Sequence, residues 1–244
     1  MKILNRLEQK QNILSKQVDF NLNLRFDEIL GIFQDITTTH SKLMGVDYEN
    51  MLKNSNAYWV LSKMKFKLDG LFKSGDEIVA ITWPLAPSTF RFIRDYKILG
   101  EKGEILGRSE WCVLDAITLR LRKLDSVCYP KELEHLNNAV DLTEFTRFTE
   151  EFSIEDYLTE YKAVFTDIDC NKHVNNLSYA KMALNTFSLE EFESFNFNAF
   201  EIHFISQTFF EDKIKLYKKV FDDRVCVLGE KNEKPVFKAL FYKE

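Results

Sequence analysis

The densest group of side chains suited to acid–base chemistry lies in one stretch of the second half, residues 169–176 (Asp-Cys-Asn-Lys-His-Val-Asn-Asn). Asp169, Asn171 and His173 alternate along it, so an extended backbone would point a carboxylate, an amide and an imidazole to one side. An imidazole moves protons at neutral pH, a carboxylate orients it or activates water, and an amide holds a carbonyl or that water. The combination predicts a hydrolase site.

The neighbours of these three residues have simpler interpretations. Asp167 and Asn175 flank a predicted helix start, where Asp and Asn are most often turn formers and caps. Free backbone N–H groups at that helix start would also favour an anion. Cys170 falls between Asp169 and Asn171, so it would point away from them, and no neighbouring feature marks it as a reactive thiol. We therefore do not expect Cys170 to be the nucleophile.

The elements that must position this site follow from hydrophobic periodicity. Apolar residues recur at three- and four-residue spacing over 26–44, which predicts an amphipathic helix. Strands are predicted after it at 58–68, 77–83, 90–99 and 105–117. In the first of these, Met64 and Phe66 should face inward and Lys63, Lys65 and Lys67 outward. The pattern is a helix followed by an antiparallel meander.

The second half repeats this order, which indicates an internal duplication. A strand is predicted at 162–165, a helix at 174–187, and further strands at 200–209, 213–221, 225–229 and 235–242. The first-half counterpart of the polar stretch reads Asn21-Leu22-Asn23-Leu24-Arg25 in this alignment, without a carboxylate or an imidazole. Only the second copy is therefore predicted to be catalytic.

Composition and charge exclude several classes of protein. The chain has 244 residues, 45% apolar and 29% charged, which is the balance of a globular protein with a large core. The formal charge is −5 and neither half of the chain is strongly basic, so a nucleic-acid partner is not expected. No apolar run approaches a membrane span, and the four cysteines form no Cys-x-x-Cys pair. We expect a cytoplasmic protein with reduced thiols, no metal and no organic cofactor.

The chain resembles the acyl-acyl-carrier-protein (acyl-ACP) thioesterases of the bacterial type, which are related to the plant fatty acyl-ACP enzymes. The resemblance rests on residues 169–176 with Tyr179 after them, and on first-half motifs, which are Thr82-Trp83-Pro84, Arg94-Asp95-Tyr96 and Ser109-Glu110-Trp111 with Asp115. It implies an α+β tandem hot-dog fold, two helix-wrapped antiparallel sheets in one chain. Residues 1–128 would form an acyl-binding hot-dog, 129–156 a connection, and 157–244 the catalytic hot-dog.

The resemblance also implies site residues. Asp169, Asn171 and His173 match the family's catalytic Asp-x-Asn-x-His positions. Gln207 and Thr208 fall where plant members have a Glu-Cys pair, so a thiolate is not available here. Gln207 cannot abstract a proton but can position a water, which leaves Asp169 or His173 as the base. The predicted catalytic residues are thus Asp169, Asn171, His173 and Gln207.

Substrate contacts are expected mainly in the first half. The bottom of an acyl pocket would be closed by residues of the first helix and first strand, or these would be ordinary core; the predicted contacts are Phe33, Thr37, His40 and Trp59, together with Thr208 from the second half. His40 lies on the apolar stripe of the helix, which is also typical of a satisfied core histidine.

The resemblance implies hydrolysis of fatty acyl-ACP to a free fatty acid and ACP. Two alternatives stay open: an acyl-CoA thioesterase, for which the chain lacks an obvious adenine or phosphate motif, and a non-catalytic acyl-binding module. ACP is acidic, so basic side chains of the first half, above all Arg120, Arg122 and Lys123, are predicted to attract it. A homodimer is compatible with the sequence.

Overall fold

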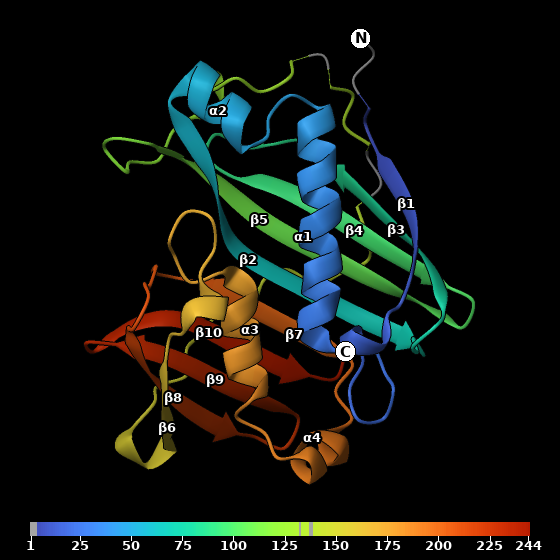
Figure 1. The fold of residues 1–244 in the computed structure, drawn as a ribbon, viewed down its shortest axis with the longest axis vertical. Helices are drawn as coiled ribbons and strands as arrows, with labels where there is room; N and C mark the ends of the chain where they lie inside the picture. Colours follow the sequence, from blue (N-terminus) through green and yellow to red (C-terminus); the bar gives the residue numbers. More distant parts are fainter. Residues whose placement is uncertain (1–3, 132, 137–138) are drawn as a thin grey trace. The chain divides into compact units, whose positions relative to one another are not determined.

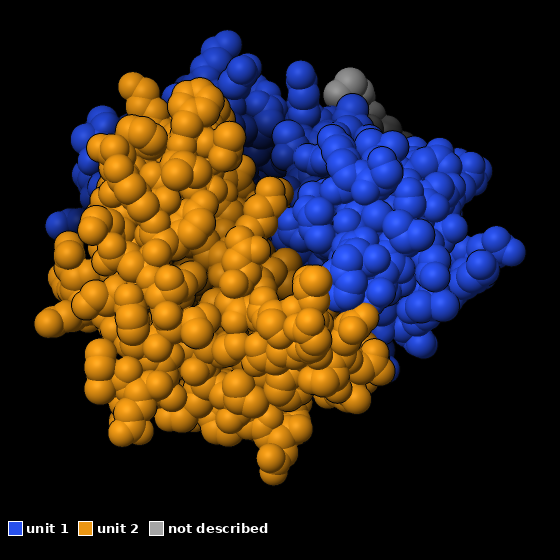
Figure 2. Space-filling view, turned by 60° about the horizontal axis from the view of Figure 1, so that its bottom comes forward, with its two compact units in different colours: residues 1–143 blue, residues 144–244 orange. Residues whose placement is uncertain are grey.

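The computed structural model describes residues 4–131, 133–136 and 139–244. The chain divides into two compact units, residues 1–143 and residues 144–244, which Figure 2 shows in different colours. Each unit has its own helices and its own antiparallel strands, and each is described here by itself.

Unit 1 is a five-stranded antiparallel sheet with a long helix along one face (Figure 1). Its helices are α1 (Phe26–Leu43) and α2 (Tyr48–Ser55). Its strands are β1 (Leu7–Asn12), β2 (Ala57–Gly70), β3 (Glu77–Pro84), β4 (Phe92–Gly100) and β5 (Gly103–Asp115). The strand order is β1-β3-β4-β5-β2, and every neighbouring pair is antiparallel.

Unit 2 repeats this arrangement on a smaller scale (Figure 1). Its helices are α3 (Asn176–Leu184) and α4 (Leu189–Phe195). Its strands are β6 (Tyr157–Lys162), β7 (Ala199–Phe204), β8 (Lys213–Val220), β9 (Arg224–Lys231) and β10 (Lys234–Tyr242). The order β6-β8-β9-β10-β7 is that of unit 1, strand for strand. The predicted α+β duplication, a helix on each antiparallel sheet, is confirmed.

Aromatic packing fixes α1 on its sheet. The ring of Phe33 stacks on Tyr96 of β4 with centroids 4.4 Å apart, and Phe26 meets Phe66 of β2 edge-on at 5.0 Å. Gly107 of β5 lies beneath Phe33, where an added Cβ would come within 2.3 Å of the ring. A glycine is therefore required at this point for the helix to approach the sheet so closely.

Several predicted boundaries were wrong. The first strand of unit 2 is β6 at 157–162 rather than 162–165, because residues 165–167 form a short 3-10 turn. β7 stops at Phe204 rather than at 209, and α3 covers only 176–184 of the predicted 174–187. Periodicity missed β1, α2 and α4 altogether, since each is short and mostly exposed on one side. Element ends are where sequence patterns carry least information.

The expectation that Lys65 faces water was also wrong. Met64 and Phe66 are buried as predicted, but Lys65 between them is fully buried too. Its Nζ donates to the hydroxyl of Thr143 at 2.9 Å. A buried ammonium needs partners of this kind, because leaving it unsolvated and unpaired would be costly. No helix within the described residues is long and apolar enough to span a membrane.

Candidate active site

The predicted catalytic stretch is a tight loop rather than an extended strand. The backbone N–H of Asp169 donates to the carbonyl of His173 at 2.8 Å, and Lys172 donates back to the carbonyl of Asp169 at 3.0 Å. Lys172 closes the turn in the left-handed region at φ 65°. The prediction that Asp169, Asn171 and His173 alternate along an extended backbone was therefore wrong, because polar side chains in this sequence favour a local turn.

The carboxylate of Asp169 holds this loop together. Its Oδ1 accepts hydrogen bonds from the backbone N–H of Asn171 at 2.8 Å and from that of His173 at 3.1 Å. Its Oδ2 accepts none from any residue that the structure describes. One oxygen of Asp169 thus serves the fold, and the other is available to a substrate, a water or a proton.

His173 lies between this loop and the segment that follows β7. Its backbone forms an isolated bridge with Phe209, and its ring meets the ring of Phe209 edge-on with centroids 5.1 Å apart. The imidazole nitrogens make no hydrogen bond to another described residue. The ring is therefore held by packing on one side while both nitrogens stay available. Phe209 was not predicted, and its only sequence signal is its place directly after Thr208.

The segment that carries Gln207 lies beside the loop, as the resemblance implied. Val174 donates its N–H to the carbonyl of Thr208 at 2.8 Å, which ties the two segments together. Gln207 is exposed, whereas Thr208 is buried. The hydroxyl of Thr208 hydrogen-bonds to the Tyr179 hydroxyl at 2.8 Å, and burial raises the pKa of Tyr179. Of this pair, Gln207 is thus the residue that can meet substrate or solvent.

The start of α3 is capped as expected. The side chain of Asn175 accepts from the backbone N–H of Leu177 at 2.9 Å. Asp167 accepts from the Tyr161 hydroxyl and from the N–H of Val164, so it is a turn former. Asn171 is exposed on the loop, and its side-chain amide binds no other described residue. The loop therefore presents the amide of Asn171 and the imidazole of His173 near a helix N-terminus, whose dipole favours negative charge.

Unit 1 contains the same loop, beginning at Asp19. Oδ1 of Asp19 accepts from the N–H of Asn21 at 2.8 Å and from that of Asn23 at 2.9 Å. The sequence analysis took Asn21 as the first residue of the unit 1 counterpart and therefore predicted no carboxylate there. That prediction was wrong, because the loop begins at Asp19. The absence of an imidazole was correctly predicted, because Asn23 stands where His173 stands.

Three of the predicted acyl contacts line the buried face of α1. Phe33 and His40 are buried and Thr37 is half-buried. The Thr37 hydroxyl donates to the carbonyl of Phe33 at 2.7 Å and hydrogen-bonds to the Tyr96 hydroxyl at 2.8 Å. This series of hydrogen bonds continues to the hydroxyl of Ser109, which lies 2.8 Å from that of Tyr96 and accepts from the indole N–H of Trp111 at 2.7 Å. These hydroxyls satisfy one another within unit 1.

His40 is paired with a buried arginine. Arg94 donates to Nδ1 of His40 at 2.8 Å, so Nε2 carries the proton that is donated to the carbonyl of Leu4 at 2.7 Å. Burial, and then the charge of Arg94, lower the pKa of His40 to about 4. His40 is therefore a neutral, satisfied core histidine. Trp59, the fourth predicted contact, is half-buried and donates from Nε1 to the carbonyl of Val46 at 2.7 Å.

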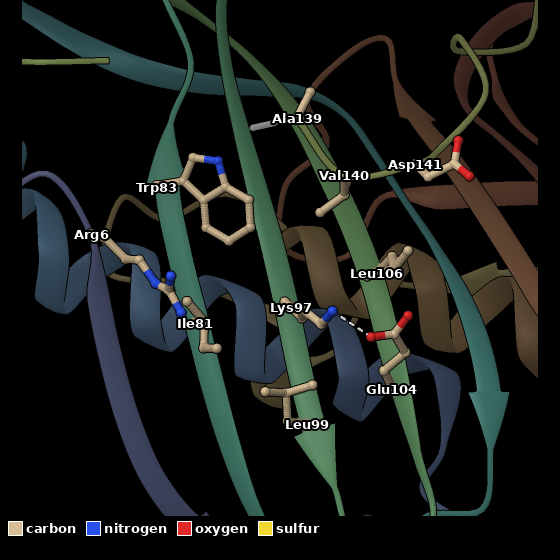
Figure 3. Close-up of a pocket in the computed structure, with 10 residues that line it drawn as sticks. All are labelled: Arg6, Ile81, Trp83, Lys97, Leu99, Glu104, Leu106, Ala139, Val140 and Asp141. Carbon is tan, nitrogen blue, oxygen red and sulfur yellow. Dashed lines mark ion pairs between the residues drawn. The ribbon is translucent and has the colours of Figure 1, made fainter. Parts of the chain in front are cut away.

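A groove of about 470 Å³ lies on the outer face of the unit 1 sheet (Figure 3). Its floor is apolar, with Ile81, Trp83, Leu106 and Val140. Glu104 is engaged by Lys97 across it at 2.5 Å. The groove contains none of the predicted catalytic residues. No cluster of three or more metal-ligating side chains was found among the described residues.

The duplicated helix-and-sheet units place the chain among the tandem hot-dog proteins. Residues 5–128 match the acyl-ACP thioesterase N-terminal domain, and residues 150–239 match the acyl-ACP thioesterase C-terminal domain. The chain therefore belongs to the acyl-ACP thioesterase family, as the sequence motifs indicated.

Similar proteins agree with this assignment. The chain is 25% identical over 200 residues to an acyl-[acyl-carrier-protein] hydrolase of Cuphea viscosissima, covering 76% of this chain and 48% of that protein. It is 24% identical over 210 residues to a palmitoyl-acyl carrier protein thioesterase of Gossypium hirsutum, covering 80% and 50%. Both of those proteins are chloroplastic. The chain thus spans about half the length of these curated relatives.

Solved structures share the fold over nearly the whole chain. An acyl-ACP thioesterase from Bacteroides thetaiotaomicron superposes with a TM-score of 0.85 at 19% identity, covering 98% of each chain. A 12:0-ACP thioesterase from Umbellularia californica superposes with a TM-score of 0.83 at 17% identity, covering 97% of this chain and 96% of that one. The tandem hot-dog prediction is confirmed.

Proposed function

We propose that this protein hydrolyses the thioester of fatty acyl-ACP, releasing a free fatty acid and the carrier thiol. Family membership over both domains supports the reaction class. The observation that carries the proposal is the loop of unit 2, where the imidazole of His173 has both nitrogens available and the adjoining segment carries the exposed Gln207. The equivalent loop of unit 1 has no such group.

In the proposed mechanism, a water oxygen bonds to the thioester carbonyl carbon while a base takes its proton. The base is Oδ2 of Asp169 or a nitrogen of His173. The carbon–sulfur bond then breaks, the acid leaves, and the departing sulfur receives the proton. Gln207 positions the water through its carbonyl oxygen and amide.

The negative charge that develops on the carbonyl oxygen would be stabilised by Asn171 and by the N-terminal N–H groups of α3. A preorganised donor set of this kind contributes roughly 10²–10³ in rate, and a general base contributes roughly 10²–10⁴. Together these contributions are sufficient without a covalent intermediate. The hydroxyl of Thr208 is buried against Tyr179, so the proposal uses water rather than Thr208 as the nucleophile.

The proposal divides the work between the units. Residues 1–128 would bind the acyl chain, 129–156 would connect, and 157–244 would carry the chemistry. Phe33, Thr37, His40 and Trp59 line the interior of unit 1. Because Thr37 and His40 already satisfy their own hydrogen bonds there, they would contribute shape and apolar surface rather than polar recognition.

Purified protein offered acyl-ACP and acyl-CoA side by side, with free thiol measured, tests the function. We expect release from acyl-ACP at a higher kcat/KM than from acyl-CoA, and none in a blank without protein. Faster release from acyl-CoA would identify an acyl-CoA thioesterase. Binding of both substrates without release would identify a non-catalytic acyl-binding protein.

We place the protein in the cytoplasm because its four cysteines are free thiols, as expected in a reducing compartment. Thiol titration before and after reduction would test this, since a disulfide in freshly purified protein contradicts it. The sequence is also compatible with a homodimer, which the mass in light scattering would test; a single-chain mass at assay concentration would exclude it.

A further inference from the structure

A loop at one end of unit 1 presents an unusual set of side chains to solvent. Residues 116–123 follow β5 and project beyond the sheet, as the yellow-green hairpin at the left of Figure 1. Its three aliphatic side chains are largely exposed: Ile117 at 79%, Leu119 at 62% and Leu121 at 55%. Three such neighbours on one projecting tip form an apolar patch of the kind that marks an interaction site.

The tip is held rigidly by Asp115. Oδ1 of Asp115 accepts from the backbone N–H of Ile117 at 3.1 Å and from that of Thr118 at 2.8 Å. These bonds lower the pKa of Asp115 to about 2. Its Oδ2 accepts from Arg122 at 2.9 Å. The apolar side chains are therefore displayed by an ordered turn that needs none of them for its hydrogen bonds.

Leu119 occupies a backbone conformation that leucine disfavours. Its φ is 57°, in the left-handed region where Gly and Asn are the usual residues. The side chain is exposed, so core packing does not compensate for this conformation. Asparagine would suit the turn better, so neither the backbone nor packing within the chain favours leucine here.

The charge around the tip is basic. Arg120 and Lys123 are exposed and form no ion pair with another residue in the described part of the chain. Arg122 is engaged by Asp115 and by the carbonyl of Ser126 at 2.6 Å. Asp125 is the exposed acid that follows. The tip therefore combines aliphatic side chains with two unpaired cations.

The C-terminal end of helix α2 is tied to this loop by a backbone hydrogen bond. The N–H of Ala116 donates to the carbonyl of Asn56 at 2.9 Å, just past the end of α2. Tyr48 and Leu52 lie four residues apart on one face of that helix and are 47% and 39% exposed. Lys53 beside them is exposed as well.

We propose that this loop, residues 116–123, docks the protein reversibly on an anionic lipid surface. Aliphatic side chains on a projecting tip suit insertion about 5–10 Å into the headgroup region, where their apolar surface leaves water. Arg120 and Lys123 would then lie at the level of anionic headgroups, which attract basic side chains. This assignment differs from the sequence-based prediction that Arg120, Arg122 and Lys123 attract an acidic carrier protein, because the aliphatic side chains dominate the tip. It does not depend on the proposed hydrolysis.

Flotation of the full chain with vesicles tests the proposal. We expect binding to mixed phosphatidylcholine–phosphatidylglycerol vesicles and weaker binding to pure phosphatidylcholine. The double variant Ile117→Ser/Leu119→Asn should bind the mixed vesicles about tenfold or more weakly, because both inserted side chains become polar. Arg120→Gln should weaken binding about fivefold, as expected for one basic side chain at an anionic surface.

Leu22→Asn is the matched control. Leu22 is also exposed, at 58%, and also left-handed, at φ 62°, but it lies in the loop next to the opposite end of β2. It should bind vesicles like the parent. Equal losses of vesicle binding in Leu22→Asn and in the tip variants would mean that the chain binds vesicles non-specifically through exposed apolar side chains, and would overturn the proposal. So would tip variants with unchanged vesicle binding, including the case in which they bind acyl carrier protein more weakly, which would make the loop a protein-docking site.

Discussion

The loops at residues 19–25 and 169–175 have the same backbone and different chemistry. In both loops, one carboxylate oxygen accepts hydrogen bonds from two backbone N–H groups. In unit 1, Asp19 accepts from Asn21 and Asn23. In unit 2, Asp169 accepts from the residues at the same two positions, Asn171 and His173. Both loops turn through a left-handed residue, Leu22 or Lys172. The side-chain oxygen of this aspartate therefore stabilises the loop in both units, and the presence of the aspartate alone does not make a catalytic site.

What distinguishes the loops is what they present to solvent. His173 of unit 2 is replaced by Asn23 in unit 1. The adjoining segment differs in the same way: Leu24 donates to the carbonyl of Phe72 and Val174 to that of Thr208, both at 2.8 Å, so Leu71 corresponds to Gln207. Unit 2 thus has an imidazole and an amide where unit 1 has an amide and an aliphatic chain. Those two differences are the chemistry that the comparison isolates.

The largest difference between the two loops is expected for the paired variants Asp169→Asn and Asp19→Asn. Asparagine keeps an oxygen that accepts the two backbone hydrogen bonds, so both variants should fold with unchanged melting temperatures. If Oδ2 of Asp169 is the base or orients it, Asp169→Asn loses roughly 10²–10⁴ in kcat/KM for acyl-ACP, whereas Asp19→Asn loses nothing. Near-parental turnover in Asp169→Asn would give that carboxylate the purely structural role of Asp19.

Gln207→Leu gives unit 2 the residue of unit 1. A side chain that positions water should cost about 10²-fold in kcat when it is lost, because a misplaced nucleophile reacts slowly. Gln207→Glu preserves reach and an acceptor oxygen and should retain activity. The two variants are compared in kcat for acyl-ACP, and a Gln207→Leu protein as fast as the parent would remove Gln207 from the site.

The pH dependence of stability should come from unit 1 through His40. Its pKa is about 4 in the folded chain against 6.5 ordinarily, so the unfolded chain binds more protons between these values. The free energy of unfolding should therefore fall as pH is lowered from about 6.5 to about 4. Urea unfolding across this range measures it, with His40→Gln as control. If the free energy of unfolding of His40→Gln falls with pH as steeply as that of the parent, groups other than His40 cause the pH dependence.

The smallest effect is expected at Cys170, whose counterpart in unit 1 is Phe20. Because water is the proposed nucleophile, Cys170→Ser should keep kcat/KM for acyl-ACP within about twofold of the parent. Mass spectrometry during turnover should find no acyl group on Cys170. A trapped acyl-cysteine would contradict the mechanism.

Hydrophobic periodicity predicted most of the secondary-structure elements correctly. The helix predicted at 26–44 and the strands β2–β5 and β8–β10 were found within two residues of their predicted ends, because apolar periodicity reflects burial directly. Lys65 was misplaced because alternation assumes that one face of a strand meets water, and the contact with Thr143 is not visible in the pattern. Short elements such as α2 carry too few residues for a periodic signal.

The site was predicted as a set of residues rather than as a geometry. The family resemblance implied that Gln207 lies at the Asp169–His173 loop, and the hydrogen bond between Val174 and Thr208 shows that the two segments adjoin. Spacing did not reveal that Asp169 closes a turn, nor that Asp19 does the same, because side-chain-to-backbone hydrogen bonds leave no periodic trace. The roles of Asp169, Asn171, His173 and Gln207 stay predictions.

His173 is the residue that would make the second loop catalytic, and His173→Asn replaces it with the residue that the first loop has at this position. The substitution keeps the backbone N–H of residue 173, which donates a hydrogen bond to Asp169, so the melting temperature should not change. The rate of thiol release from acyl-ACP should fall by roughly 10²–10⁴, the usual contribution of an acid–base group. A His173→Asn protein that folds like the parent and releases thiol at the parental rate would contradict the account.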